Sequence, residues 1–88
     1  MTKITDRELV TLRYTLIPMV VAEHEHQIEK WGVQSKSPFE WMTNLTEEIG
    51  ELAQAITEAE YNNGCLEDVR KEAIQVATLA LKIAEMYN

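Results

Sequence analysis

The 88-residue sequence has few of the residues that break helices or cross-link chains. It contains three glycines, two prolines and a single cysteine, Cys65, which has no partner for an internal disulfide. No stretch approaches the roughly 18 consecutive apolar residues that a membrane-spanning helix needs. The polar N-terminus also lacks the apolar segment of a signal peptide. We therefore expect a soluble, cytoplasmic protein that has no membrane partner.

Positive charge is also scarce. The sequence contains eight Lys and Arg residues and fifteen Asp and Glu residues, which gives a net charge of −7. This balance argues against binding to a nucleic-acid polymer, which requires a basic surface. A small polyanion stays possible if metal ions bridge it to the carboxylates.

The residues that are abundant favour helices. The chain is 45% apolar and 26% charged, with short β-branched runs and no repeat, linker or low-complexity segment. These features predict one all-α domain that covers residues 1–88. A domain of this size has a marginal core. We therefore expect a homodimer or homotetramer, in which helical pairs complete a four-helix-type bundle.

The first helix has clear signals at both ends. A capping box at Thr5–Glu8 predicts a start near Asp6. The helical spacing of apolar residues continues through Lys30 and stops at Gly32, a suitable C-terminal cap. Because proline lacks an N–H and clashes with the preceding turn, Pro18 predicts a kink or a break near Ile17.

Two further helices follow as an antiparallel hairpin. Ser37, Pro38 and Glu40 give a strong start signal for a second helix that runs to about Tyr61. A turn at residues 62–64 leads into a third helix, which begins near Leu66 and extends almost to the C-terminus. The predicted inward face of the second helix consists of Trp41, Leu45, Ile49, Leu52, Ile56 and Ala59. That of the third helix consists of Val69, Ala73, Val76, Leu79, Ala80, Ile83 and Tyr87.

Three carboxylates interrupt this apolar pattern. Glu48 and Glu51 are three residues apart and therefore share one flank of the second helix. Glu72 projects from the middle of the apolar face of the third helix, at a comparable height along the hairpin. A carboxylate in that position costs several kcal/mol unless it is neutralised, paired or bound to a metal.

The preferred interpretation is a carboxylate cluster, built from two facing helices, that holds a hard divalent cation. Ligands that are all oxygen atoms suit Mg²⁺ or Mn²⁺. Two alternatives remain open from the residues alone. Glu48 and Glu51 can form a solvated acidic flank, and Glu72 can form a buried salt bridge with Arg70, Lys71 or Arg13.

The end of the first helix carries groups that can bind a planar ligand. His24, Gln27 and Trp31 follow helical spacing and share a face. They suggest a pocket wall that stacks on a ring and hydrogen-bonds its edge. The alternative is an exposed helix end whose tryptophan covers a neighbouring helix. Arg70 and Lys71, at the start of the third helix, could hold phosphate oxygens or be ordinary solvated charges.

Taken together, these motifs resemble a known family. Glu48-x-x-Glu51, a gap of twenty residues and Glu72-x-x-Gln75 are similar to the signature of MazG-like, all-α nucleoside triphosphate pyrophosphohydrolases. The segments TEEIGELAQAI, HQIEKWG and SPFEW also resemble this family, so the similarity covers roughly residues 23–86. It implies antiparallel helices in dimers or tetramers. It also implies hydrolysis between the α and β phosphates, which yields a nucleoside monophosphate and pyrophosphate.

The resemblance also implies roles for single residues. Glu48, Glu51 and Glu72 would be magnesium ligands, Glu47 would orient or deprotonate the attacking water, and Gln27, Lys30 and Trp31 would line the pocket. Gln75 occupies the fourth ligand position, where the family has Asp. A neutral amide is a weaker ligand than a carboxylate. The alternatives are therefore a non-catalytic descendant that binds nucleotide or metal, and a purely structural helical oligomer.

Overall fold

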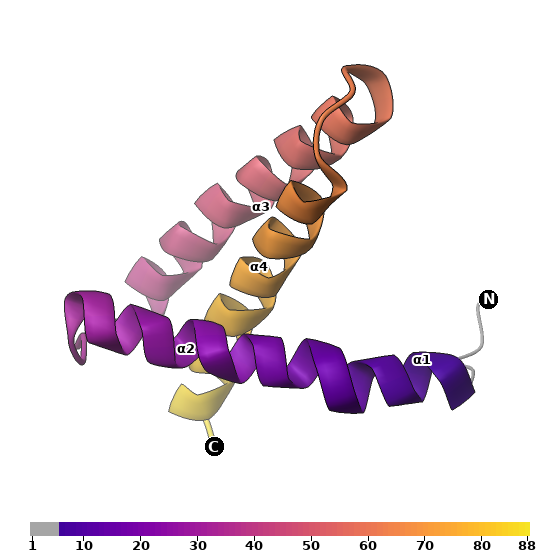
Figure 1. Cartoon of the computed structure of the whole chain (residues 1–88). Helices are drawn as coiled ribbons and strands as arrows, with labels where there is room; N and C mark the ends of the chain where they lie inside the picture. Colours follow the sequence, from indigo (N-terminus) through magenta and orange to yellow (C-terminus); the bar gives the residue numbers. More distant parts are fainter. Residues whose placement is uncertain (1–5) are drawn as a thin grey trace.

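The computed structural model describes residues 6–88, and every regular element in that range is helical. The helices are α1 (Asp6–Thr11), the π-helical segment η1 (Leu12–Leu16), α2 (Ile17–Trp31), α3 (Pro38–Tyr61) and α4 (Leu66–Met86) (Figure 1). The prediction of an all-α chain is thereby confirmed.

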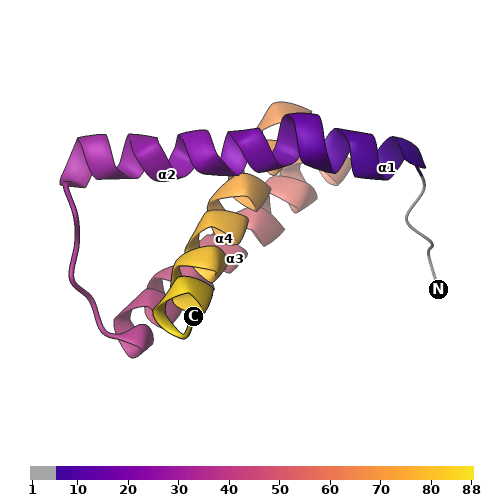
Figure 2. The same cartoon turned by 90° about the horizontal axis from the view of Figure 1, so that it is seen from below.

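α1, η1 and α2 form one continuous helical rod (Figures 1 and 2). The irregularity predicted near Ile17 is present as η1, which ends at Leu16, and the helix continues through it without a break. In η1 the helix widens, and the N–H of Ile17 donates to the carbonyl of Leu12. Because Pro18 lacks an N–H and crowds the carbonyl four residues before it, the preceding turn relaxes into π geometry. The predicted cap residue Thr5 lies outside the described residues.

The remaining helix ends are where the sequence signals place them. Gly32 adopts a φ of 74° after α2, and its N–H donates to the Ile28 carbonyl at 2.7 Å. At the start of α3, the Glu40 N–H donates to Ser37 Oγ at 3.2 Å, and the Ser37 N–H donates to Glu40 Oε1 at 3.1 Å. This reciprocal capping box, with Pro38 at the first helical position, confirms the predicted start.

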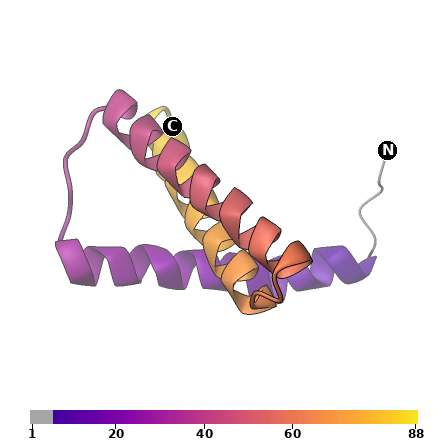
Figure 3. The ribbon, with the colours of Figure 1, turned by 90° about the horizontal axis from the view of Figure 1, so that it is seen from above.

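α4 lies at the centre of the packing. It runs antiparallel beside α3, and α2 crosses it (Figures 1 and 3). The α3–α4 interface holds the main hydrophobic cluster, Trp41, Leu45 and Leu79, with Val76 and Ile83 packed against it. The predicted hairpin is therefore confirmed, and the crossing of α2 adds a second interface to α4.

The inward faces differ in part from the predicted ones. Ile49 and Ile56 are nearly half exposed, and Tyr87 is 74% exposed. Ala73 and Ala80 are also exposed. Ile74 and Thr78, which the sequence pattern did not select, are buried instead. The reason is that α4 packs on two sides, so its buried surface is turned partly toward α2, where Ile74 lies near Met19 and Ala22.

The described helices include none that combines the length and the apolar character needed to cross a membrane.

Candidate metal centre and adjoining clefts

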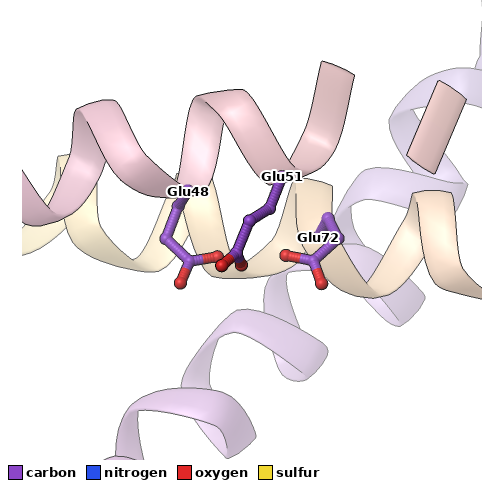
Figure 4. Close-up of side chains that lie close together, drawn as sticks. All are labelled: Glu48, Glu51 and Glu72. Atoms are coloured by element: carbon purple, nitrogen blue, oxygen red, sulfur yellow. The ribbon is translucent and has the colours of Figure 1, made fainter. Parts of the chain in front are cut away.

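Three carboxylates converge on the side of the hairpin that faces α2. Glu48 and Glu51 project from α3, and Glu72 projects from α4, so that their carboxyl groups turn toward one another (Figure 4). One oxygen from each residue lies within 4.8 Å of the others. Glu48 and Glu72 are half-buried, whereas Glu51 is exposed. We call these three residues the carboxylate cluster.

This crowding changes the protonation of Glu48. Burial raises the pKa of its carboxyl from 4.5 to about 7, and a hydrogen bond with Glu72 and the charge of Glu51 add to the effect. Each of these causes opposes ionisation. With a pKa of about 7, Glu48 keeps its proton in a large fraction of the molecules near neutral pH when no metal is bound.

Gln75 completes the arrangement one turn after Glu72. Its amide faces the acceptor oxygens of Glu48 and Glu72, and with the nitrogen toward them it donates to Glu48 Oε2 at 2.9 Å and to Glu72 Oε2 at 3.1 Å. The residue thus has two useful orientations. Its nitrogen suits the metal-free carboxylates, and its oxygen suits a cation held between them.

The salt-bridge alternative for Glu72 is not observed. Arg70 forms its ion pair with Glu67 on the same helix, at 2.7 Å. Among residues 6–88 no ion pair joins Glu72 to Arg70, Lys71 or Arg13. Glu72 therefore lies beside Glu48 and Glu51 rather than beside a basic side chain.

A cleft of about 500 Å³ opens beside the carboxylate cluster. We call it the carboxylate cleft. Its walls come from α2, the α2–α3 connection, α3 and α4. Seven residues singled out from the sequence line it, namely Gln27, Lys30, Trp31, Glu47, Glu48, Lys71 and Gln75. The volume falls within the range of small-molecule sites.

The other residues predicted for the site lie in different surroundings. Glu47 is exposed and lies at the carboxylate cleft outside the cluster. Lys30 holds its ammonium 4.7 Å from the centre of the Trp31 ring, and that ring is 56% exposed. Glu51 and Glu72 face a separate acidic groove, so the cluster stands between two hollows. Arg70 does not line the carboxylate cleft.

A second cleft of about 510 Å³ adjoins the first. Its lining is mostly apolar, and we call it the apolar cleft; it includes Ile28, Val33, Leu81 and Met86, with His24 at its wall. Gln27, Gln34 and Trp41 line both clefts. The predicted shared face of His24, Gln27 and Trp31 is thus divided between two neighbouring hollows.

Two lysines beside these clefts could not be predicted as site residues from the sequence. Lys36 lies in the α2–α3 connection and Lys82 near the end of α4, and both approach the ring of Trp41. Neither belongs to a recognisable motif, and Trp41 reads in the sequence as an ordinary core residue. The packing of α4 against α3 brings Lys82 to Trp41, and the α2–α3 connection brings Lys36 to the same ring.

No family model, curated protein or solved structure matches the chain. The function is therefore inferred from the residues of the site.

Proposed function

We propose that the protein is a Mg²⁺-dependent nucleoside triphosphate pyrophosphohydrolase of the MazG-like type. The observation that carries the proposal is the carboxylate cluster, in which Glu48, Glu51 and Glu72 from two facing helices bring one oxygen each within 4.8 Å of the others. The proposed reaction converts a nucleoside or deoxynucleoside triphosphate into a monophosphate and pyrophosphate.

The residues of the cluster fit a hard divalent cation. Mg²⁺ binds oxygen at about 2.1 Å, so two ligands on opposite sides of it lie about 4.2 Å apart and two adjacent ligands about 3 Å apart. The three cluster oxygens, which lie within 4.8 Å of one another, would have to draw closer around the ion. Gln75 can add a neutral oxygen. Mn²⁺ accepts the same ligands. When bound, such an ion supplies charge neutralisation, polarisation of a phosphoryl group and a lowered pKa for water.

The chain's own residues can perform the remaining tasks. Lys30 and Lys71 line the carboxylate cleft and provide positive charge for phosphate oxygens. The exposed ring of Trp31 can stack on a nucleobase. Glu47 lies at the same cleft beside Glu48, where it can orient a water molecule or accept its proton. These roles match what phosphoryl-type transfer requires, namely positioning and charge stabilisation.

We also propose that the protein works as a homodimer or homotetramer. A compact monomer of this mass exposes roughly 5,300 Å², whereas the chain exposes 6943 Å². α1 and η1 bury no residue, although Leu9, Val10, Leu12 and Tyr14 lie there with exposed fractions of 42–69%. A second copy that covers these residues would complete a four-helix-type bundle.

The decisive experiment measures pyrophosphate release from a panel of ribo- and deoxyribonucleoside triphosphates with Mg²⁺, Mn²⁺ or EDTA. We expect metal-dependent release that EDTA abolishes. Because losing a residue behind a metal ligand already costs 10- to 100-fold, Glu72→Gln should lower the rate by about 100-fold or more. Glu60→Gln, an exposed residue of α3, is the matched control.

A binding-only descendant is the second candidate, and Gln75 favours it. Its amide can satisfy Glu48 and Glu72 without any metal, and as a metal ligand it is neutral. For this candidate no triphosphate is cleaved, yet Mg²⁺ or nucleotide raises the melting temperature. A protein that neither releases pyrophosphate nor responds thermally would instead be a structural helical oligomer.

A further inference from the structure

Lys36 and Lys82 approach the same buried ring. Their ammonium nitrogens lie 4.8 Å and 4.7 Å from the centre of the Trp41 indole. That indole is 8% exposed and belongs to the hydrophobic cluster of α3 and α4. The buried Trp41 ring therefore attracts the two ammonium groups by cation–π interaction, and it is not an open surface on which a base could stack.

The two ammonium groups lack a matching negative partner. Burial, and then the charge of Lys36, lower the pKa of Lys82, while Glu23 acts in the opposite direction. The carboxylate of Glu23 is engaged by the Gln27 amide at 3.0 Å. Within the described range of the chain, no ion pair joins Lys36 or Lys82 to an acidic side chain. A bound anion would relieve this repulsion and the cost of burial.

The position of Lys82 is set by a hydrogen bond. Its ammonium donates to Gln27 Oε1, on α2. An ammonium has three donors, so two are left for a ligand. Lys36 lines the carboxylate cleft and Lys82 lines the apolar cleft. The two lysines therefore stand where the clefts meet, and either cleft gives a ligand access to them.

This place is well separated from the carboxylate cluster. On α3, Trp41 and Glu48 are seven residues apart, and on α4, Gln75 and Lys82 are also seven residues apart. Seven residues correspond to two helical turns, or about 10 Å. The two lysines are therefore offset from the carboxylate cluster by about two helical turns along the hairpin.

We propose that Lys36 and Lys82 form a second anion subsite, which binds a phosphate group about 10 Å from the carboxylate cluster. The choice of phosphate rests on the proposed function, whereas anion binding itself requires neither metal nor turnover. The phosphate can belong to the same molecule that lies at the cluster, or it can be a separate inorganic ion. Both sources place the same chemistry against the two ammonium groups.

The test measures binding of inorganic tripolyphosphate by isothermal titration calorimetry at low salt in EDTA. Without metal the carboxylates repel this anion, so its binding depends on lysines, and the variants show whether Lys36 and Lys82 are the ones that hold it. Lys36→Met and Lys82→Met should each weaken binding by at least about tenfold, because a charge-assisted hydrogen bond is lost. Arg13→Met removes a positive charge from η1, outside both clefts, and should bind like the wild type.

Further variants separate this inference from the proposed function. Lys82→Arg keeps the charge and should retain anion binding. If Lys82→Met does not fold, Lys36→Met tests the subsite, because Lys36 lies in the connection between α2 and α3. Glu72→Gln should bind the anion at least as tightly as the wild type, whatever its effect on turnover. No binding by the wild type in EDTA, or equal binding by Lys36→Met and Arg13→Met, would overturn the inference.

The source of the phosphate follows from a second titration with Mg²⁺ and ATP. A loss of ATP affinity in Lys82→Met assigns the subsite to a phosphate of the nucleotide. Unchanged ATP affinity, together with lost tripolyphosphate binding, assigns it to a separate anion. Either result supports the subsite.

Discussion

At the scale of the residue, the main feature is the crowding of three carboxyl groups in the carboxylate cluster. Glu48 is held beside Glu51 and Glu72, and its pKa rises to about 7. Spacing along the sequence predicted that these three residues would meet, because facing helices of a hairpin place residues at matching heights side by side. Neither the protonation of Glu48 nor the two useful orientations of Gln75 could be read from spacing, since both depend on distances across the interface.

The pKa of Glu48 predicts how stability depends on pH. Its folded-state pKa is about 7 and its ordinary value is 4.5, so the folded metal-free protein binds the proton more tightly than the unfolded chain. This stabilisation is complete below about pH 4.5 and is lost as the pH rises through about 7. In EDTA we expect the melting temperature to fall over this window. Glu48→Gln should flatten the decline, and Glu60→Gln should leave it unchanged.

Metal binding should show the opposite dependence. Because the cation must displace the proton held by Glu48, the increase in melting temperature caused by Mg²⁺ should grow as the pH rises through about 7. A Mg²⁺ effect that is independent of pH would contradict the assignment of Glu48 as a ligand.

At the scale of the element, the hairpin depends on the turn between α3 and α4. Asn63 adopts a positive φ of 56°, and the Gly64 N–H donates to the Glu58 carbonyl at 2.8 Å. A Cβ added at Gly64 would lie 2.8 Å from the backbone carbon of Glu58. Glycine at this position therefore permits the close return of the chain that aligns Glu72 with Glu48 and Glu51.

Two glycine substitutions should act in opposite directions. Gly64→Ala introduces a contact with helix backbone and should destabilise the fold by roughly 1–3 kcal/mol. Gly50→Ala, in the middle of α3, meets nothing within 4 Å and should stabilise the fold by about 0.5–1 kcal/mol. Urea unfolding of both variants in EDTA provides the comparison. Equal stability of Gly64→Ala and wild type would show that the turn is not tightly packed.

At the scale of the whole molecule, the surface is too apolar and too large for an isolated compact chain. The radius of gyration is 14.4 Å, against about 12 Å for a compact domain of this length. Only five hydrophobic side chains within the described residues are buried. We therefore expect a second copy to cover the exposed apolar residues of α1 and η1.

The oligomeric state can be measured by light scattering coupled to gel filtration. We expect a dimer or a tetramer for the wild type. Leu12→Glu places a charge on the exposed apolar part of η1 and should shift the protein toward the monomer. Thr11→Glu, on a different side of the same rod, should shift it less. A monomeric wild type at micromolar concentration would disprove the assembly.

The sequence by itself determined the helices, their ends and the convergence of the carboxylates. Capping residues, the turn at residues 62–64 and apolar spacing act over a few residues, so they can be read locally. Only the tertiary structure decided where α2 crosses α4. That crossing turns Ile74 toward α2 and gives both clefts a wall from α2, while the packing of α3 on α4 brings Lys82 against Trp41. The crossing arises from side-chain packing between segments far apart in the chain, and no local pattern encodes it.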